Sequence, residues 1–283
     1  MDWVTRMNAA LHWIEDHLTD GIDLTALARM TGLSPYQFHS VFVCMTDMTV
    51  AEYARRRRMS RAAAELQNGA RVLDVALKYG YQSPTAFNRA FRQVHGFAPS
   101  EAQRPGARLK SYPPIRFQIT VKGVEEMKYH IKPMEAFTVI GKAREFDMEN
   151  SFAEIPRFWD AYYAQNPCPP VRGCLGVCRE SLDGSGRFTY IIADPCEPDA
   201  AVPEGYERFA IPAFTWAVFE GQGAMPDALQ SLNRRILTEW LPANGEFDLA
   251  GGWNVESYSM GDMQSEAYRF ELWIPVKRKE EGK

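Results

Sequence analysis

The chain has 283 residues, of which 46% are hydrophobic and 12% aromatic, and its formal net charge is −4 at pH 7. This length and apolar content predict two domains with cores of their own, and no apolar run approaches the roughly 18 residues of a membrane-spanning helix. The N-terminus is amphipathic and unlike a signal peptide, and the five scattered cysteines form no Cys-x-x-Cys pair, so we expect a cytoplasmic protein without metal or cofactor.

One pattern occurs twice in the first hundred residues. Its first copy is Ala28-x3-Gly32-Leu33-Ser34-Pro35-x2-Phe38-x3-Phe42, and its second copy is Ala76-x3-Gly80-Tyr81-Gln82-Ser83-Pro84-x2-Phe87-x3-Phe91. In each copy a glycine that can take a positive φ ends one helix, and the next helix starts with a serine N-cap and a proline at its first position. The pattern therefore predicts two helix-turn-helix motifs.

The second helix of each copy has an inner apolar stripe and an outer face, as its residues sort at about 100° per position. Arginine reads guanine and asparagine reads adenine in a major groove, so Arg89 and Asn88 are the strongest candidates for base contacts. The first copy has no arginine, and we expect it to contact phosphates or thymine methyls. The alternative is that both are ordinary solvated faces. The predicted DNA-contacting residues are Tyr36, Gln37, His39, Ser40, Thr85, Asn88, Arg89 and Arg92.

A single long helix is predicted between the two copies. It begins at a capping box, Thr49-Val-Ala-Glu52, passes through an arginine run at 55–58 and ends at Asn68-Gly69. Arg56 and Arg57 are predicted to contact phosphates, and the alternative is a solvated face. Residues 1–110 carry 14 Lys and Arg against 10 Asp and Glu, whereas the rest of the chain carries 18 against 26, so the basic share lies with the repeat.

Residues 4–104 resemble the DNA-binding domain of AraC/XylS-type transcription regulators. The matching residues are the two patterns above, the linking helix Tyr53-x-Arg55-Arg56-Arg57-Arg58-Met59-x-Arg61-Ala62-Ala63, and Tyr79-Gly80-Tyr81-x-Ser83-Pro84-x2-Phe87-x-Arg89-x-Phe91-x4-Gly96-x2-Pro99-Ser100. The resemblance implies a seven-helix unit that enters successive major-groove segments of double-stranded promoter DNA without two-fold symmetry. We place this domain at residues 1–108, first in the chain as in the Rob-like arrangement, and RNA polymerase is a further partner that the resemblance allows.

The Pro/Gly-rich segment 104–114 marks a domain boundary, and residues 109–126 are predicted as a linker. Two similar β-α-β-β blocks follow within residues 127–278, the second beginning at Tyr206. Ala136-Phe137-Thr138 recurs as Ala213-Phe214-Thr215, and each copy is followed by a strand and then a helix, which suggests an internal duplication. The fold class is therefore an all-helical domain followed by a duplicated α+β domain. Predicted strands cover 117–122, 127–132, 135–141, 173–180, 187–194, 253–259 and 268–276, and predicted helices cover 151–164 and 225–241.

The second domain resembles the GyrI-like effector-binding domain, most clearly in the terminal Glu271-Leu272-Trp273-Ile274-Pro275-Val276. The resemblance covers residues 127–277 and implies a cleft for small, often lipophilic and cationic effectors with an acidic residue at its floor. Alternation puts Glu271 on the same side as Trp273, where a carboxylate beside aromatic faces attracts a cation. The alternatives are a structural carboxylate and aromatic core packing. The predicted ligand-binding residues are Glu271, Trp273, Trp216, Trp253 and Tyr258.

These observations predict a transcription regulator, not an enzyme, in which the first domain reads promoter DNA and the second binds a small-molecule effector that changes this activity. No Ser/His/Asp, Cys/His or metal-binding constellation stands out in the sequence. Two alternatives stay open for the second domain. It could hydrolyse reactive small molecules, with Glu271 and a nearby tyrosine acting as general base, or it could dock another protein.

Overall fold

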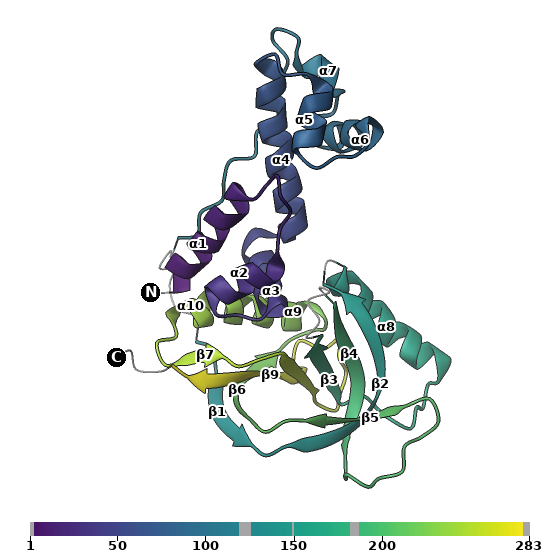
Figure 1. Cartoon of the computed structure of the whole chain (residues 1–283). Coiled ribbons are helices and arrows are strands. Elements are labelled where there is room, and N and C mark those ends of the chain that lie inside the picture. The colour runs from purple at the N-terminus through teal and green to yellow at the C-terminus, as the bar shows by residue number, and fades with distance from the viewer. Residues whose placement is uncertain (1–2, 119–125, 149, 182–186, 280–283) are drawn as a thin grey trace. The chain divides into compact units, whose positions relative to one another are not determined.

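The computed structural model describes residues 3–118, 126–148, 150–181 and 187–279. The chain divides into two units, Met1–Gly32 with Thr46–Thr120, and Leu33–Met45 with Val121–Lys283. None of the helices in these described ranges is long and apolar enough to cross a membrane. The first unit is helical (Figure 1), with α1 (Trp3–Asp16), α2 (Leu24–Thr31), α4 (Val50–Gln67), α5 (Val72–Lys78), α6 (Pro84–His95) and α7 (Pro99–Ala102).

The helix ends of the first unit follow the local sequence signals. Asp23 caps α2 by accepting a hydrogen bond from the Thr25 amide at 2.8 Å, and Thr49 caps α4 by accepting one from the Glu52 amide at 3.1 Å. Gly32 and Gly80 follow α2 and α5 with φ of 75° and 79°, in the left-handed region that favours glycine. The prediction that a glycine with positive φ ends the first helix of each helix-turn-helix motif is confirmed.

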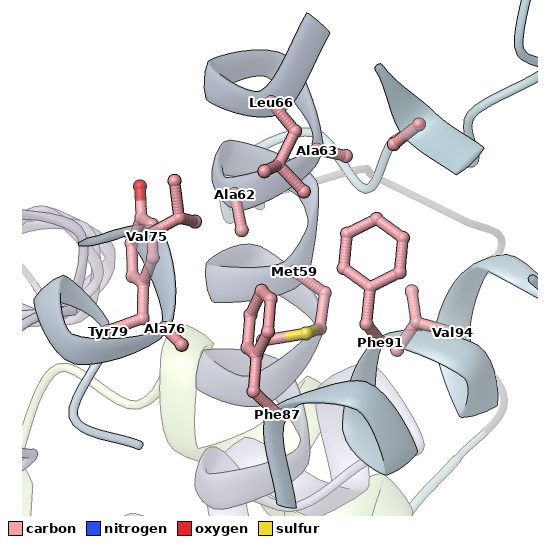
Figure 2. Packing of buried hydrophobic residues seen from close by; sticks show 11 residues of the cluster. Met59, Ala62, Ala63, Leu66, Val75, Ala76, Tyr79, Phe87, Phe91 and Val94 are labelled. Atoms are coloured by element: carbon pink, nitrogen blue, oxygen red, sulfur yellow. The ribbon is translucent and has the colours of Figure 1, made fainter. Parts of the chain in front are cut away.

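The second helix-turn-helix motif is fastened to α4 by an apolar core (Figure 2). Met59 and Leu66 of α4 pack against Phe87 and Phe91 of α6, and Val75 of α5 closes the same cluster. The two phenylalanine rings lie 5.8 Å apart between centroids. Because apolar residues of α6 recur at helical spacing, burying this one stripe fixes which side of the helix faces solvent.

The segment predicted as the start of the linker lies along the first unit. The Tyr112 amide donates to Ser60 Oγ at 2.9 Å, and the Ile115 amide donates to the Tyr53 hydroxyl at 3.2 Å. Phe117 exchanges two hydrogen bonds with the Asn8 side chain, both 2.9 Å long. The first unit therefore continues beyond residue 108. Residues 117 and 118 are not in a strand, and the rest of the strand predicted at 117–122 lies outside the described residues.

The second unit contains α3 and a mixed set of strands and helices (Figure 1). Its strands form one antiparallel sheet in the order β1-β6-β9-β8-β3-β4-β2-β5, and β7 pairs with β9. The bounds are α3 (Pro35–Thr46), β1 (Tyr129–Met134), β2 (Phe137–Asp147), α8 (Ser151–Gln165), β3 (Leu175–Glu180), β4 (Arg187–Cys196), β5 (Glu207–Ile211), β6 (Phe214–Gln222), α9 (Asp227–Arg235), α10 (Leu241–Ala243), β7 (Phe247–Leu249), β8 (Trp253–Tyr258) and β9 (Arg269–Arg278), with a π-helical turn (Ile236–Trp240) between α9 and α10.

The strand order confirms the predicted duplication. Exchanging β1 with β5, β2 with β6, β3 with β8 and β4 with β9 returns the same order read backwards. The β3–β8 pair lies at the centre of this pseudo-two-fold arrangement. The predicted helix at 225–241 is formed by α9, the π-helical turn and α10 together, and the short strand β7 was not predicted.

The two faces of the sheet have different environments. One face buries a core that includes Val177, Ile191, Trp216 and Val255. On the other face, Phe188 and Tyr190 of β4 pack with aromatic residues of α8. Since successive side chains of a strand point to opposite faces, each position of β8 and β9 belongs either to the closed core or to the face that α8 covers.

Candidate effector cavity and DNA-contacting helices

A cavity of about 310 Å³ lies on the helix-covered face of the second unit. Its floor is formed by alternate residues of the central strands β3, β4, β8 and β9, and its walls by α8, α9 and α3. Much of the lining is apolar or aromatic, and its charged or titratable groups among the described residues include Glu256, Asp160 and His39, with no Lys or Arg. A largely apolar cavity with a few convergent polar groups is typical of a small-molecule site.

Glu256 on β8 is the central polar group of the cavity floor. Its Oε2 accepts hydrogen bonds from the hydroxyl groups of Tyr190 at 2.5 Å and Tyr258 at 2.6 Å. Tyr190 also accepts a hydrogen bond from Trp159 Nε1 of α8, at 3.0 Å. Gly176 faces Glu256 in the β3–β8 register, and a Cβ there would come within 2.2 Å of the Tyr190 hydroxyl. The sheet therefore leaves room for this cluster by placing a glycine opposite it.

The electrostatics of Glu256 suit a cationic ligand. Burial raises the pKa of its carboxyl group above the usual 4.5, while the hydrogen bonds from Tyr190 and Tyr258 act in the opposite direction. Burial and the nearby Glu256 charge raise the pKa of both tyrosines well above 10, so both hydroxyls remain protonated donors at neutral pH. No ion pair joins Glu256 to a Lys or Arg among the described residues, which leaves its charge without a cationic partner.

Aromatic rings stand around this carboxylate. Trp159 lies perpendicular to Tyr258, with ring centroids 5.5 Å apart, and stacks on Tyr163 at 6.1 Å. All three rings line the cavity. Ring faces attract cations, with about 0.5–2 kcal/mol per contact depending on desolvation. The arrangement can thus offer a cation both a formal negative charge and several π-faces.

Four of the five predicted ligand-binding residues lie away from this cavity. Glu271 and Trp273 share the opposite face, as alternation predicted, and Trp273 Nε1 donates to Glu271 Oε2 at 2.7 Å. Leu272 and Ile274 are the β9 residues that reach the cavity. Glu271 instead lines a second, polar hollow that also contains Lys128 and Arg269.

The tryptophans predicted as walls belong to the core face too. Trp216 is completely buried in the core, and Trp253 packs against the same cluster. Tyr258 alone of the predicted set lines the cavity. Glu256, two residues before Tyr258 on the predicted strand 253–259, was missed, although their spacing already placed them on one face. The alternation was right, but the sequence did not reveal which face the helices cover.

The predicted outer face of α6 is largely open to solvent. Thr85, Arg89 and Arg92 are exposed, and Asn88 is half-buried. The Asn88 Oδ1 has no hydrogen-bond partner among the described residues. The predicted N-cap Ser83 makes no side-chain capping bond, which is a difference from the expectation. Thr85, Arg89 and Arg92 are thus open to a nucleic acid, whereas the Asn88 Oδ1 atom is buried.

The predicted outer face of α3 is not open. Gln37 and His39 are buried, and Tyr36, His39 and Ser40 line the cavity of the second unit. Gln37 forms a reciprocal capping pair with Ser34, in which the Gln37 amide donates to Ser34 Oγ at 3.1 Å and the Ser34 amide donates to Gln37 Oε1 at 3.0 Å. No residue of α3 is exposed. Its sequence carries aromatic or aliphatic residues on every side, so no single stripe suffices to bury them.

The arginines predicted to contact phosphates are engaged within the first unit. Arg57 is buried, and its Nε and Nη2 donate to the two carboxylate oxygens of Glu15 in α1, both at 2.7 Å. Its Nη1 donates to the Tyr112 carbonyl. Arg56 pairs with Glu52 at 2.5 Å and lies over the Tyr112 ring at 5.1 Å. Arg57 is therefore a buried structural residue, because a carboxylate 42 positions earlier neutralises it.

Comparison with known proteins matches both units. The family described as integron-associated effector binding protein matches residues 130–276, and a helix-turn-helix domain family matches residues 27–105. The transcriptional regulator Rob of Salmonella typhimurium is 26% identical over 242 residues, covering 79% of this chain and 81% of that protein. The transcriptional activator AarP of Providencia stuartii is 38% identical over 91 residues, covering 32% and 67%.

A solved structure of SAV2435 bound to tetraphenylphosphonium is 25% identical, with a TM-score of 0.47, and covers 53% of this chain and 94% of that one. The double helix-turn-helix unit and the effector-binding unit together define a DNA-binding transcription regulator. More particularly, the chain belongs to the integron-associated effector-binding protein family, here preceded by an AraC-type DNA-binding domain in the Rob-like arrangement.

Proposed function

We propose that the cavity of the second unit binds a small lipophilic cation and that the Glu256 carboxylate is its anionic partner. The observation that carries this proposal is the carboxylate itself, which is held by two tyrosine hydroxyls among aromatic rings and has no Lys or Arg beside it in the described part of the cavity. A bound cation supplies the missing charge, and the aromatic walls select against strongly hydrated ions.

Calorimetric titration of the full chain with tetraphenylphosphonium tests the charge requirement. The neutral triphenylphosphine oxide and the anionic tetraphenylborate are matched probes of similar aromatic surface. We expect binding of the cation only, and Glu256→Gln should weaken it roughly tenfold to a hundredfold, since a hydrogen bond or contact with a charged group is worth about 1.5–3 kcal/mol. Glu271→Gln is the matched control and should bind like the wild type. Equal affinity for all three probes contradicts the proposal.

The affinity for the cation should also depend on pH. Because burial raises the pKa of Glu256, the carboxylate of the ligand-free protein becomes protonated at a higher pH than an exposed glutamate does. Cation affinity should therefore fall as the pH drops through this raised pKa, beginning above 4.5. The same linkage makes ionised Glu256 a destabilising group above that pKa in the free protein, where a bound cation offsets its cost. We expect the cation affinity of the wild type to depend on pH and that of Glu256→Gln not to depend on it.

For the first unit we propose that the exposed face of α6 reads promoter DNA. Arg89 and Asn88 are the proposed base contacts, with Thr85 and Arg92 beside them. Regulation of this activity by the bound cation, and contact with RNA polymerase, belong to the same proposal. The alternative of protein docking alone is tested by the same titration, because saturable binding of a small cation argues against it. The alternative of hydrolysis is tested separately, by incubating the chain with reactive electrophiles, and turnover would support it.

A further inference from the structure

Helix α3 has two assignments in this molecule. From the sequence, Tyr36, His39 and Ser40 form the outer face of the first recognition helix. In the second unit, the same three side chains line the effector cavity. A recognition helix contacts DNA with its outer face inside a major groove about 12 Å wide. A side chain that is part of the cavity wall is therefore not available to a base edge or phosphate at the same time.

Specific contacts hold α3 in the second unit. The Tyr36 amide, in the first turn of the helix, donates to the Glu180 carboxylate of β3 at 2.9 Å. Glu180 is buried, and a negative charge at a helix N-terminus is favourable because the unpaired N–H groups there carry partial positive charge. The Tyr36 ring packs on Phe188 of β4, with centroids 4.8 Å apart. Burial, followed by the neighbouring Cys178 thiol, raises the pKa of the Tyr36 hydroxyl well above 10.

His39, also on α3 in the cavity wall, has a buried ring nitrogen that a ligand could bind. Its residue is only 4% exposed, and its Nε2 is buried without a hydrogen-bond partner among the described residues. Burial lowers the pKa of the imidazole, while Asp147 and the Met148 backbone act in the opposite direction, so the ring is neutral at pH 7. Buried polar atoms are nearly always paired in native proteins. An effector that fills the cavity can meet this nitrogen.

We propose that α3 is a shared surface, whose Tyr36, His39 and Ser40 side chains contact the effector when α3 lies in the cavity wall and contact DNA when it does not. The inference rests on the proposed cation site. An effector that contacts α3 in the cavity wall binds this state of the protein more tightly than the state in which α3 lies in a DNA major groove. By linkage, effector and DNA weaken each other by the same factor, for which about 5- to 100-fold is a usual range.

The test measures DNA affinity by fluorescence anisotropy with the full chain, a duplex enriched by that chain from a random library, and tetraphenylphosphonium as the probe. We expect saturating probe to weaken DNA binding and saturating DNA to weaken probe binding by an equal factor. The inference is overturned if the probe tightens DNA binding. It is also overturned if calorimetry shows that the probe binds but neither ligand changes the affinity for the other; both results leave the cation site intact. If calorimetry detects no probe binding, the proposed function fails first.

A pair of variants isolates the role of α3. Glu180 lines neither the cavity nor the predicted DNA face, and Glu180→Ala removes the acceptor of the Tyr36 amide. This variant should bind DNA more tightly without the probe and show a smaller probe effect, while Glu180→Gln, which keeps an oxygen acceptor, should lie nearer the wild type. Arg89→Ala is the control, since it should weaken DNA binding by one factor with and without the probe. An unchanged probe effect in Glu180→Ala contradicts the shared-surface proposal.

Hydrogen exchange supplies a measurement that does not depend on DNA or on either variant. If the probe contacts α3, the amides of α3 should exchange more slowly when tetraphenylphosphonium is bound, whereas those of α6 should not change. Slower exchange in α8 and α9 with none in α3 would mean that the cation occupies the cavity without using this helix, and would overturn the inference.

Discussion

The two helix-turn-helix copies share their turn chemistry but not the surroundings of their second helices. α6 buries one stripe, which includes Phe87 and Phe91, and leaves Arg89 and Arg92 exposed. α3 buries Phe38 and Phe42 as well, yet none of its residues is exposed. The difference lies in composition around the helix rather than in the motif. The residues of such a motif determine how its two helices pack. The residues on the other sides of the second helix determine whether that helix is exposed and able to read DNA.

The largest expected effect tests the helix that joins the copies. Arg57→Ala removes one partner of a buried pair, and breaking such a pair typically costs about 3–5 kcal/mol of unfolding free energy because a charge is left buried. Arg61→Ala is the matched control, since Arg61 meets the same Glu15 at 3.0 Å from an exposed position and should cost under about 1 kcal/mol. Denaturant unfolding measures both. If Arg57→Ala kept its stability and only flattened the salt dependence of DNA binding, the phosphate interpretation would be restored.

The same pair should respond to pH. Burial alone would raise the pKa of Glu15, but the hydrogen bonds from Arg57 and Tyr53, together with the charges of Arg57 and Arg61, outweigh burial and lower this pKa below 4.5. A lowered carboxyl pKa contributes stability above the unfolded value that is lost as the pH falls through the folded value. The stability difference between the wild type and Glu15→Gln should thus shrink in acid, which unfolding at several pH values can follow.

The next largest expected effect is a difference in DNA affinity between a variant of α6 and a variant of α3. Arg89→Ala in α6 should cost about 1–3 kcal/mol and relax the preference at one base pair. His39→Ala in α3 should change DNA binding less and effector binding more, since His39 is in the cavity wall. Affinities across a panel of single-base variants of the site, with a parallel titration of tetraphenylphosphonium, measure both. A larger DNA effect for His39 than for Arg89 would reverse the roles assigned to the two helices.

The smallest expected effect compares the two capping serines. Ser34 accepts a hydrogen bond from the Gln37 amide, whereas Ser83 makes no side-chain capping bond. Ser34→Ala should therefore cost about 1 kcal/mol of unfolding free energy, and Ser83→Ala close to none. Chemical denaturation of the two variants side by side provides the check, and equal losses would show that the caps do not distinguish the copies.

Short-range patterns predicted most of the elements. Helical spacing gave α8 and the paired helix-turn-helix motifs, and alternation gave β3, β4, β8 and β9 close to their observed bounds. What short-range patterns do not contain is which segments become neighbours. The choice between Glu256 and Glu271 depends on which sheet face α8 covers, and the burial of Arg57 depends on Glu15, which lies on another helix. The burial of α3 on all sides could have been predicted, because its sequence has apolar residues on every side.

The interleaved strand order also bears on how such a cavity could arise. β1 pairs with β6 and β5 with β2, so the first strand of each half extends the sheet of the other half, while each half keeps a three-stranded sheet of its own, β3-β4-β2 or β6-β9-β8. Two identical halves would have to place the same side chain on both sides of the axis. One continuous chain is free of that constraint: in the central strand pair Gly176 of β3 faces Glu256 of β8, so only one half supplies the carboxylate on the floor of the cavity.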